Sequence, residues 1–97
     1  LVYTSDTLPC DEVIKNSKDA YILIHDSTYS VQDIDKARKH MHSTAVDAAI
    51  TAATAGVKIL LLYHISTRYS DTVRLLHEAR TKFFNTLVAE ELMKIII

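Results

Sequence analysis

Apolar stretches recur along the chain at lengths that suit short, buried strands. Residues 21–24 and 58–63 are the clearest, because apolar side chains run through each with almost no polar interruption. Residues 1–3 and 86–89 predict two shorter strands, and residues 92–97 predict a final one. These strands alternate with stretches of helical character.

Helices are predicted in the intervals between the strands. The first is short and begins after Pro9, with Asp11 placed to cap it. The last is amphipathic over residues 71–84 and ends at the asparagine that follows. Residues 30–39 are polar and charged, which is typical of a loop with some helix.

The helix ahead of the second clear strand has the strongest local signals. Ser43 or Thr44 can cap its start, and Gly56 stands where a left-handed C-terminal cap is needed. Alanines along it form a narrow surface that can pack close to a sheet. They are Ala45, Ala48, Ala49, Ala52 and Ala53. With residues 86–89 and 92–97 counted together as the last strand region, the order of elements is β-α-β-α-β-α-β, which predicts an α/β fold.

The composition limits what the chain can be. Its 97 residues are 48% hydrophobic, which suits one small domain spanning residues 1–97. The net charge of −1 gives no overall attraction to nucleic acid, so any such contact needs a local basic patch. Cys10 is the only cysteine, which excludes an internal disulfide and a Cys-rich zinc site and favours a reducing, cytoplasmic setting.

The chain carries no sign of a membrane segment or a signal peptide. No apolar run approaches the roughly 20 residues of a membrane span. The sequence starts at Leu1 without an initiator methionine and turns polar at once. We therefore expect that the chain begins within a longer protein.

Polar side chains able to hold a metal follow the predicted strands. Asp6 follows the first strand, His25 and Asp26 the second, and His64 the third. Because parallel strands end at the same edge of a sheet, we expect these side chains to converge. Carboxylate and imidazole are ligands of zinc and manganese, and paired metals suit phosphodiester hydrolysis. On spacing alone, turn-capping aspartates and structural histidines are the commoner explanation.

Four segments resemble, in order, the motifs of one enzyme family. They are residues 3–10 (Tyr-Thr-Ser-Asp-Thr-Leu-Pro-Cys), 23–29 (Leu-Ile-His-Asp-Ser-Thr-Tyr), 42–44 (His-Ser-Thr) and 64–69 (His-Ile-Ser-Thr-Arg-Tyr). The family is ribonuclease Z, the tRNA 3′-processing endonuclease of the metallo-β-lactamase superfamily. Its patterns are Gly-Asp-Thr-x-Pro-Cys, His-Glu-Ala-Thr, His-Ser-Thr and His-x-Ser-x-Arg-Tyr. Each motif alone is a weak signal, but the four together are a strong one.

The chain departs from the family patterns in three ways. Ser5 stands where the family has glycine, which tolerates positive φ more cheaply. Asp26 stands where the family has glutamate, whose carboxylate reaches one methylene further. The superfamily's His-x-His-x-Asp-His motif, which supplies most metal ligands, does not occur in the chain. The resemblance therefore implies only the C-terminal half of the metallo-β-lactamase αβ/βα sandwich.

The resemblance implies roles for the metal-ligand and proton-transfer residues. Asp6 would bridge two metal ions and His64 would bind one of them; the alternatives are a turn cap and a buried structural histidine. His42 would assist proton transfer to the leaving oxygen, with Asp26 as its carboxylate partner. The alternatives are an exposed loop residue for His42 and a helix or turn cap for Asp26.

The resemblance also implies a phosphate clamp. Ser66 and Arg68 would hold the phosphate at the scissile bond, while a surface salt bridge is the alternative for Arg68. We expect His25 to support its loop and Tyr69 to pack. A basic run that could contact RNA backbone precedes His42, although a solvated loop is the commoner explanation. This run is Lys36, Arg38, Lys39 and His40.

The implied function is metal-dependent removal of the 3′ trailer from precursor tRNA by phosphodiester hydrolysis. The cofactor would be zinc, as two ions in the complete enzyme, with manganese as an alternative. The partners would be precursor tRNA, an N-terminal half that carries the missing ligands, and further copies of the chain in a homo-oligomer. The chain alone is expected to be inactive. The competing hypotheses are a non-catalytic interaction module and another metallo-β-lactamase-fold phosphodiesterase with a small substrate.

Overall fold

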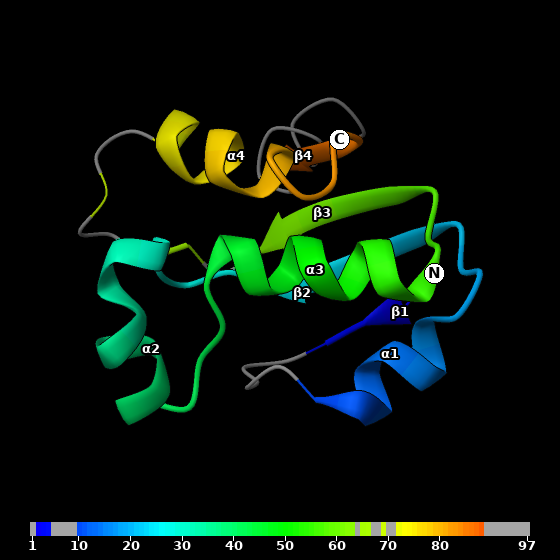
Figure 1. Ribbon diagram of the computed structural model, residues 1–97, viewed down its shortest axis with the longest axis horizontal. Helices are drawn as coiled ribbons and strands as arrows, with labels where there is room; N and C mark the ends of the chain where they lie inside the picture. Colours follow the sequence, from blue (N-terminus) through cyan, green and yellow to red (C-terminus); the bar gives the residue numbers. More distant parts are fainter. Residues whose placement is uncertain (1, 5–9, 64, 67–68, 70–71, 89–97) are drawn as a thin grey trace, which may run out of the picture.

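A four-stranded parallel sheet organises the structure, a computed structural model that describes residues 2–4, 10–63, 65–66, 69 and 72–88 (Figure 1). The strands are β1 (Val2–Tyr3), β2 (Ile22–Asp26), β3 (Ile59–Tyr63) and β4 (Thr86–Val88), and they lie in the order β1-β2-β3-β4. These four strands lie where they are predicted, although β2 extends two residues further than expected, so His25 and Asp26 belong to the strand rather than follow it. The strand predicted at 92–97 lies outside the described residues.

Helices connect the strands, so the predicted alternation of strand and helix is confirmed. They are α1 (Asp11–Ser17), the 3₁₀ helix η1 (Val31–Asp33), α2 (Ile34–Lys39), α3 (Ala45–Ala55) and α4 (Val73–Arg80). The stretch predicted as a loop with some helix is therefore mostly helical, as η1 followed by α2. No helix in the described part of the chain is long and apolar enough to cross a membrane.

The ends of α3 form as their sequence signals predict. The Thr44 hydroxyl accepts a hydrogen bond from the Asp47 amide, and the Asp47 carboxylate accepts one from the Thr44 amide. This reciprocal capping box satisfies two amides at the helix start that would otherwise lack partners. At the other end, Gly56 has φ +74° and ends the helix in the left-handed conformation that glycine adopts most cheaply.

Two details of the predicted helices are wrong. Cys10, not Asp11, is the residue that flanks the start of α1, and its side chain makes no capping hydrogen bond. Asp11 lies within the first turn, where its charge still suits the positive end of the helix dipole. Helix α4 ends at Arg80 rather than near Phe84, because the amides of Lys82 and Phe83 both bond to one carbonyl in a tight turn.

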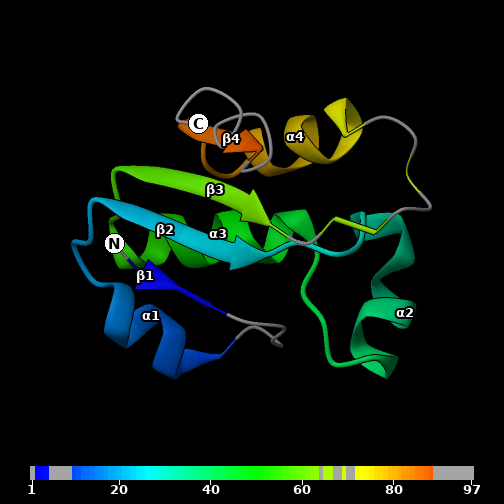
Figure 2. The ribbon, with the colours of Figure 1, turned by 180° about the vertical axis from the view of Figure 1, so that it is seen from behind.

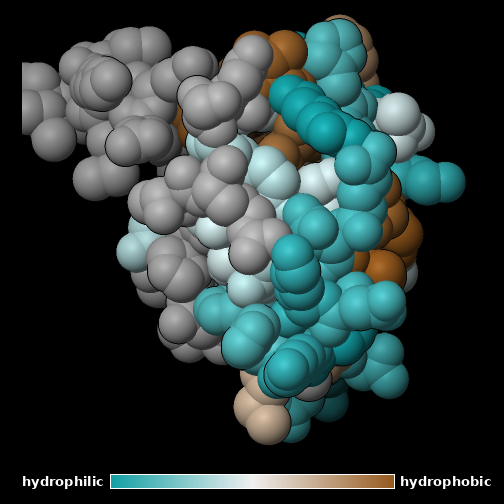
Figure 3. Space-filling model, turned by 90° about the vertical axis from the view of Figure 1, so that its left-hand side faces the viewer, coloured by the Kyte–Doolittle hydropathy of each residue, from teal (hydrophilic) through white to brown (hydrophobic). Residues whose placement is uncertain are grey.

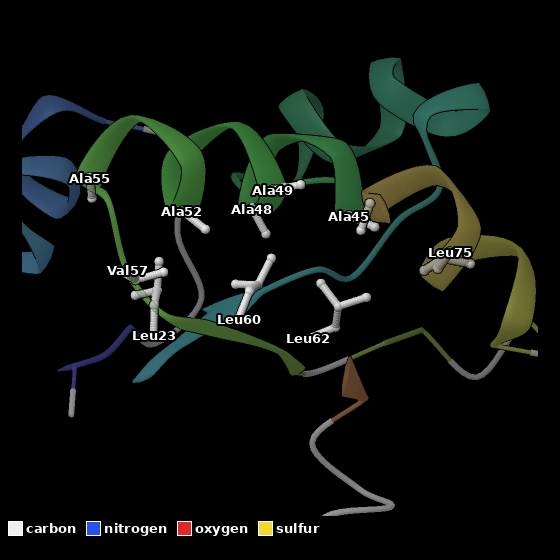
Figure 4. Close-up of a cluster of buried hydrophobic side chains, with 11 residues drawn as sticks. Leu23, Ala45, Ala48, Ala49, Ala52, Ala55, Val57, Leu60, Leu62 and Leu75 are labelled. Atoms are coloured by element: carbon white, nitrogen blue, oxygen red, sulfur yellow. The ribbon is translucent and has the colours of Figure 1, made fainter. Parts of the chain in front are cut away.

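The hydrophobic core lies between one face of the sheet and the helices. Leu23, Leu60 and Leu62 point from β2 and β3 toward the small side chains of α3 (Figure 4). Because alanine adds little bulk, α3 can lie close against the strands. The alanine surface is shifted from the predicted one, since Ala55 is buried and Ala53 is exposed. Helices α1 and α4 pack on either side of α3.

The opposite face of the sheet has no described helix over it (Figure 2). Ile22 and Ile24 of β2 are only half-buried, and Leu87 of β4 is 41% exposed. Adjacent strands are in register, with Asp26 paired with Tyr63 at the ends of β2 and β3. Parallel pairing therefore brings the ends of β1, β2 and β3 to one edge, as predicted.

Candidate active site

Asp26 is the last residue of β2 and is completely buried. Its Oδ1 accepts hydrogen bonds from the amide of Thr28 (3.1 Å) and from the Thr28 hydroxyl (2.6 Å). Its Oδ2 accepts from the His42 ring (2.9 Å) and from the Ser43 amide (3.3 Å). A buried carboxylate is stable only when such donors replace water. The residue thus caps its own turn and also binds His42.

The shorter side chain at position 26 reaches its histidine. The Nδ1 atom of His42 lies 2.9 Å from Oδ2 of Asp26, so an aspartate suffices where the family pattern has glutamate. A carboxylate only accepts, so Nδ1 carries the proton of this hydrogen bond. This arrangement fixes the ring orientation and assigns proton exchange to Nε2.

His42 is held in place through its backbone as well as its ring. Its amide donates to the carbonyl of Ala37 (2.7 Å), and the preceding Met41 has φ +59°, a left-handed conformation that costs free energy in a non-glycine residue. The side chain of His42 is 16% exposed. The alternative of a solvent-exposed loop residue is therefore wrong.

His25 points away from this pair. It lies on the same face of β2 as Leu23, is fully buried, and donates from Nδ1 to the Asp26 carbonyl at 2.8 Å. Its Nε2 has no hydrogen-bond partner among the described residues. Burial lowers the pKa of His25, although the Asp26 carbonyl and the charges of Asp26 and Asp47 partly oppose this shift. His25 is therefore neutral at physiological pH.

Of the predicted phosphate clamp, the structure describes Ser66. Its amide donates to the carbonyl of Thr28 at 2.9 Å, which places Ser66 beside the residue whose hydroxyl contacts both Asp26 and His42. Arg68 lies outside the described residues, as do Asp6 and His64.

Tyr69 packs against the core, as expected, and it also makes hydrogen bonds. Its hydroxyl accepts from the amide of Ser30 (2.9 Å) and donates to Asp33 (2.5 Å). Nearby, the carboxylate of Glu78 in α4 accepts hydrogen bonds from the Ser30 hydroxyl and the Val31 amide. Tyr69 is thereby connected to the start of η1, which is itself connected to α4.

Two residues of the basic run ahead of His42 contact carboxylates within the chain. Arg38 forms two hydrogen bonds with Asp47, and Lys36 lies 3.9 Å from Asp33. Lys39 and His40 are exposed. Figure 3 looks at the side of the molecule on which α2 lies and shows mostly hydrophilic side chains there.

The described residues do not form a metal site by themselves. No group of three or more His, Cys, Asp and Glu side chains with suitable placement occurs in the part of the chain that the structure describes. Asp26 already accepts at least four hydrogen bonds, which suits a positioning carboxylate better than a metal ligand. The predicted ligands Asp6 and His64 stay predictions.

Three groups that support Asp26 and His42 are not predicted from the sequence to do so. The Thr4 hydroxyl accepts from the Asp26 amide (3.1 Å), and Thr28 bridges Asp26 and His42. Arg38 donates to the carbonyl of His42 (3.3 Å). Both threonines lie within motif segments, which is the one signal that points to them.

The chain is similar over its whole length to known proteins. It is 43% identical over 97 residues to ribonuclease Z of Ignicoccus hospitalis, which covers all of this chain and 32% of that protein. The ribonuclease Z of Methanosarcina acetivorans is 44% identical over 96 residues, covering 98% and 32%. That of Sulfurisphaera tokodaii is 48% identical over 97 residues, covering 100% and 32%. No family model matches the chain.

Solved structures agree with the sequence matches. The metallo-β-lactamase fold protein YhfI from Bacillus subtilis superposes with a TM-score of 0.78 at 27% identity, over 87% of this chain and 34% of that one. The short form of human tRNase Z superposes with a TM-score of 0.63 at 35% identity, over 68% and 26%.

Sheet, helices and strand ends thus define part of a metallo-β-lactamase fold. Within that class the chain is related, from end to end, to ribonuclease Z. It spans about a third of the length of the curated relatives that it matches.

We predict that His25 makes the fold sensitive to acid. The pKa of His25 is lowered in the folded chain, while the unfolded chain titrates near its ordinary value of about 6.5. Below that value the unfolded chain binds a proton that the folded chain does not, so the free energy of unfolding falls as the pH decreases toward the folded pKa. Urea unfolding at several pH values between about 7.5 and 5 measures this slope.

The control is His25→Gln, which removes the titrating group and keeps a donor for the Asp26 carbonyl. We expect this variant to lose most of the pH dependence in that window. An unchanged slope in His25→Gln would assign the acid sensitivity to another group.

Proposed function

We propose that this chain is part of a metal-dependent tRNA-processing endoribonuclease, which removes the 3′ trailer of precursor tRNA by hydrolysing one phosphodiester bond. One observation carries the proposal: the buried carboxylate of Asp26 holds His42 at the carboxyl edge of the sheet, in a chain related throughout to ribonuclease Z. The chain would supply the proton-transfer part of the site. The remaining two thirds of the enzyme would supply the rest.

The pair is suited to delivering a proton to the leaving oxygen. Water attacks phosphorus and forms a new P–O bond, the bond to the leaving oxygen breaks, and that oxygen takes a proton from Nε2 of His42. Asp26 accepts the hydrogen bond from Nδ1 of His42. Its negative charge stabilises the imidazolium until Nε2 gives up its proton. The attacking water gives one proton to solvent, and Nε2 of His42 takes one proton from solvent before the next turnover, so that protons balance over the cycle.

Ser66 and Arg68 are proposed to hold the phosphate during this step. The hydrogen bond between Ser66 and Thr28 supports this role, because it fixes Ser66 next to the proton-transfer pair. A guanidinium suits phosphate because it can donate two parallel hydrogen bonds.

We propose that the metal is zinc, with Asp6 and His64 among its ligands. A bound metal would supply a water of lowered pKa and stabilise charge on the phosphate. Two ligands are too few for tight zinc binding, so residues outside this chain would complete the set. Manganese is the alternative, and the metal content of purified enzyme decides between them.

A second segment carrying the N-terminal half of the sandwich is the proposed partner. The half-buried isoleucines of β2 and the sheet face without a described helix support this, because apolar strand faces are stable when covered. We also propose a homo-oligomer, and sedimentation of the chain as a monodisperse monomer would contradict it. The free, exposed Cys10 is compatible with our proposal of a reducing cytoplasm.

We predict activity for a chimera of Ignicoccus hospitalis ribonuclease Z in which this chain replaces the matching segment of about a third of the protein. Cleavage of a 3′-extended precursor tRNA, with added zinc or manganese, is the measurement. The chain alone should not cleave, because it lacks most of the proposed ligands.

The unmodified ribonuclease Z of Ignicoccus hospitalis is the control for this experiment. A folded, metal-loaded chimera without activity on precursor tRNA would contradict the proposed function. Hydrolysis of small phosphodiesters alone would instead favour a different hydrolase. Inactivity toward both would favour an interaction module.

We predict that His42→Ala in the chimera lowers kcat by roughly 10²- to 10⁴-fold, the range for loss of a general acid. Asp26→Asn should lower kcat in the same direction, since it removes the charge that holds the ring. The double variant should lose little more than the worse single variant, because residues that act as a unit are not additive. His40→Ala, an exposed histidine two residues away, is the matched control and should leave kcat unchanged.

A further inference from the structure

Arg38 and Asp47 form the best-defined ion pair among the described residues. The Nη1 atom of Arg38 lies 2.9 Å from Oδ2 of Asp47, and Nη2 lies 3.0 Å from Oδ1. These two parallel contacts are the bidentate geometry that only a guanidinium makes with a carboxylate. The hydrogen bonds to Asp47 raise the pKa of Arg38. Burial opposes the charged form of Asp47, but the hydrogen bonds from Arg38 and Thr44 together outweigh it and lower the pKa of this carboxyl. Both groups are therefore charged.

The ion pair joins two helices across the loop that carries His42. Arg38 belongs to α2, and Asp47 belongs to the first turn of α3. The carboxylate of Asp47 also accepts from the Thr44 amide, in the capping box that fixes the start of α3. One carboxylate thus connects the end of α2 to the helix cap.

The guanidinium also contacts the His42 backbone directly. Nη1 of Arg38 donates to the carbonyl of His42 at 3.3 Å, while the His42 amide donates to Ala37. The intervening Met41 has φ +59°, so the turn needs tertiary contacts that hold it in this conformation. Arg38 supplies such contacts from one side, and Asp26 holds the ring from the other.

We propose that Arg38 is a positioning residue: by clamping Asp47 and the His42 carbonyl, it holds the His42 ring in register with Asp26. This rests on the proposed function, since it explains how the proton-transfer histidine is kept in place. It also argues against the hypothesis that Arg38 contacts the RNA backbone as part of the basic run. A guanidinium already bonded to a carboxylate at two nitrogens is poorly placed to bind phosphate as well.

The test compares Arg38→Ala, Arg38→Lys and Lys39→Ala in the chimera defined above. Arg38→Ala should lower kcat about 10-fold or more with little change in KM, because a misplaced catalytic group slows the chemical step. Arg38→Lys should also lower kcat, but by less than Arg38→Ala. Part of the loss remains because lysine cannot make the bidentate contact. Lys39→Ala removes the same charge from the exposed neighbouring position and should leave kcat unchanged. Rates are taken per folded enzyme, well below the unfolding temperature of each variant.

A role in RNA binding would give the opposite result. Arg38→Ala would then raise KM at constant kcat and reduce the dependence of binding on salt concentration by about one counterion. That outcome would overturn the proposal. A lower unfolding temperature with kcat and KM unchanged would also overturn it, because Arg38 would then only stabilise the fold.

A double variant tests the path through Asp47. If Arg38 acts through this carboxylate, Arg38→Ala and Asp47→Asn should each lower kcat, and the double variant should be no worse than the more damaged single variant. Fully additive losses would show that the two residues act separately and would overturn the clamp.

An NMR measurement keeps the inference separate from the proposed function. The Hδ1 proton of His42, held by Asp26, should give a resonance that is protected from exchange with water in the chimera. Arg38→Ala should broaden or remove this resonance, and Lys39→Ala should not. This result stands even if the chimera cleaves no tRNA, in which case only the proposed function fails. An unchanged resonance in Arg38→Ala would overturn the clamp.

Discussion

The buried carboxylate of Asp26 is the constraint on which the site depends. A charged group without access to water is stable only if donors surround it, and removing one partner of such a pair typically costs about 3–5 kcal/mol. The donors come from two segments: the turn after β2, through Thr28, and the loop before α3, through His42 and Ser43. The hydrogen bonds to the Asp26 carboxylate therefore fix the distance between the end of β2 and the start of α3.

The packing of the core makes that distance possible. The alanines of α3 lie on leucines of β2 and β3, so the helix axis comes close to the sheet. The helix start then lies at the carboxyl edge, where Tyr29 pairs with Thr44 in a short parallel bridge. A larger side chain on this surface would move the loop as well as loosen the core. Stability and site geometry thus depend on the same contact.

Much of the fold could be predicted because its signals are local. The apolar runs of β2 and β3, the caps of α3 at Thr44 and Gly56, and the order of elements follow from neighbouring residues. The errors arise where tertiary contacts decide. The exposure of Ala53 depends on the exact phase of the helix, and the end of α4 depends on a turn that the amphipathic pattern does not reveal.

The site was predictable only in part, and for a different reason. His42 and Asp26 are 16 residues apart, and nothing local links them; the family resemblance suggested the pair before the structure brought them within 2.9 Å. Arg38 was harder still, because a charged residue in a basic run is usually solvated. Its partner Asp47 is nine residues away on another helix, and only the fold brings their side chains together.

These contacts separate the site into parts with different requirements. The proposed proton-transfer pair, Asp26 and His42, is held by hydrogen bonds within this chain, from the turn after β2 to the cap of α3. Metal binding, by contrast, needs three or four ligands at once, and the proposed ones come from strand ends and from outside the chain. Precise orientation needs local, buried contacts, whereas ion binding needs several segments to converge. A chain that spans about a third of its relatives' length can therefore position its histidine by its own contacts, while the proposed metal site needs ligands from outside the chain.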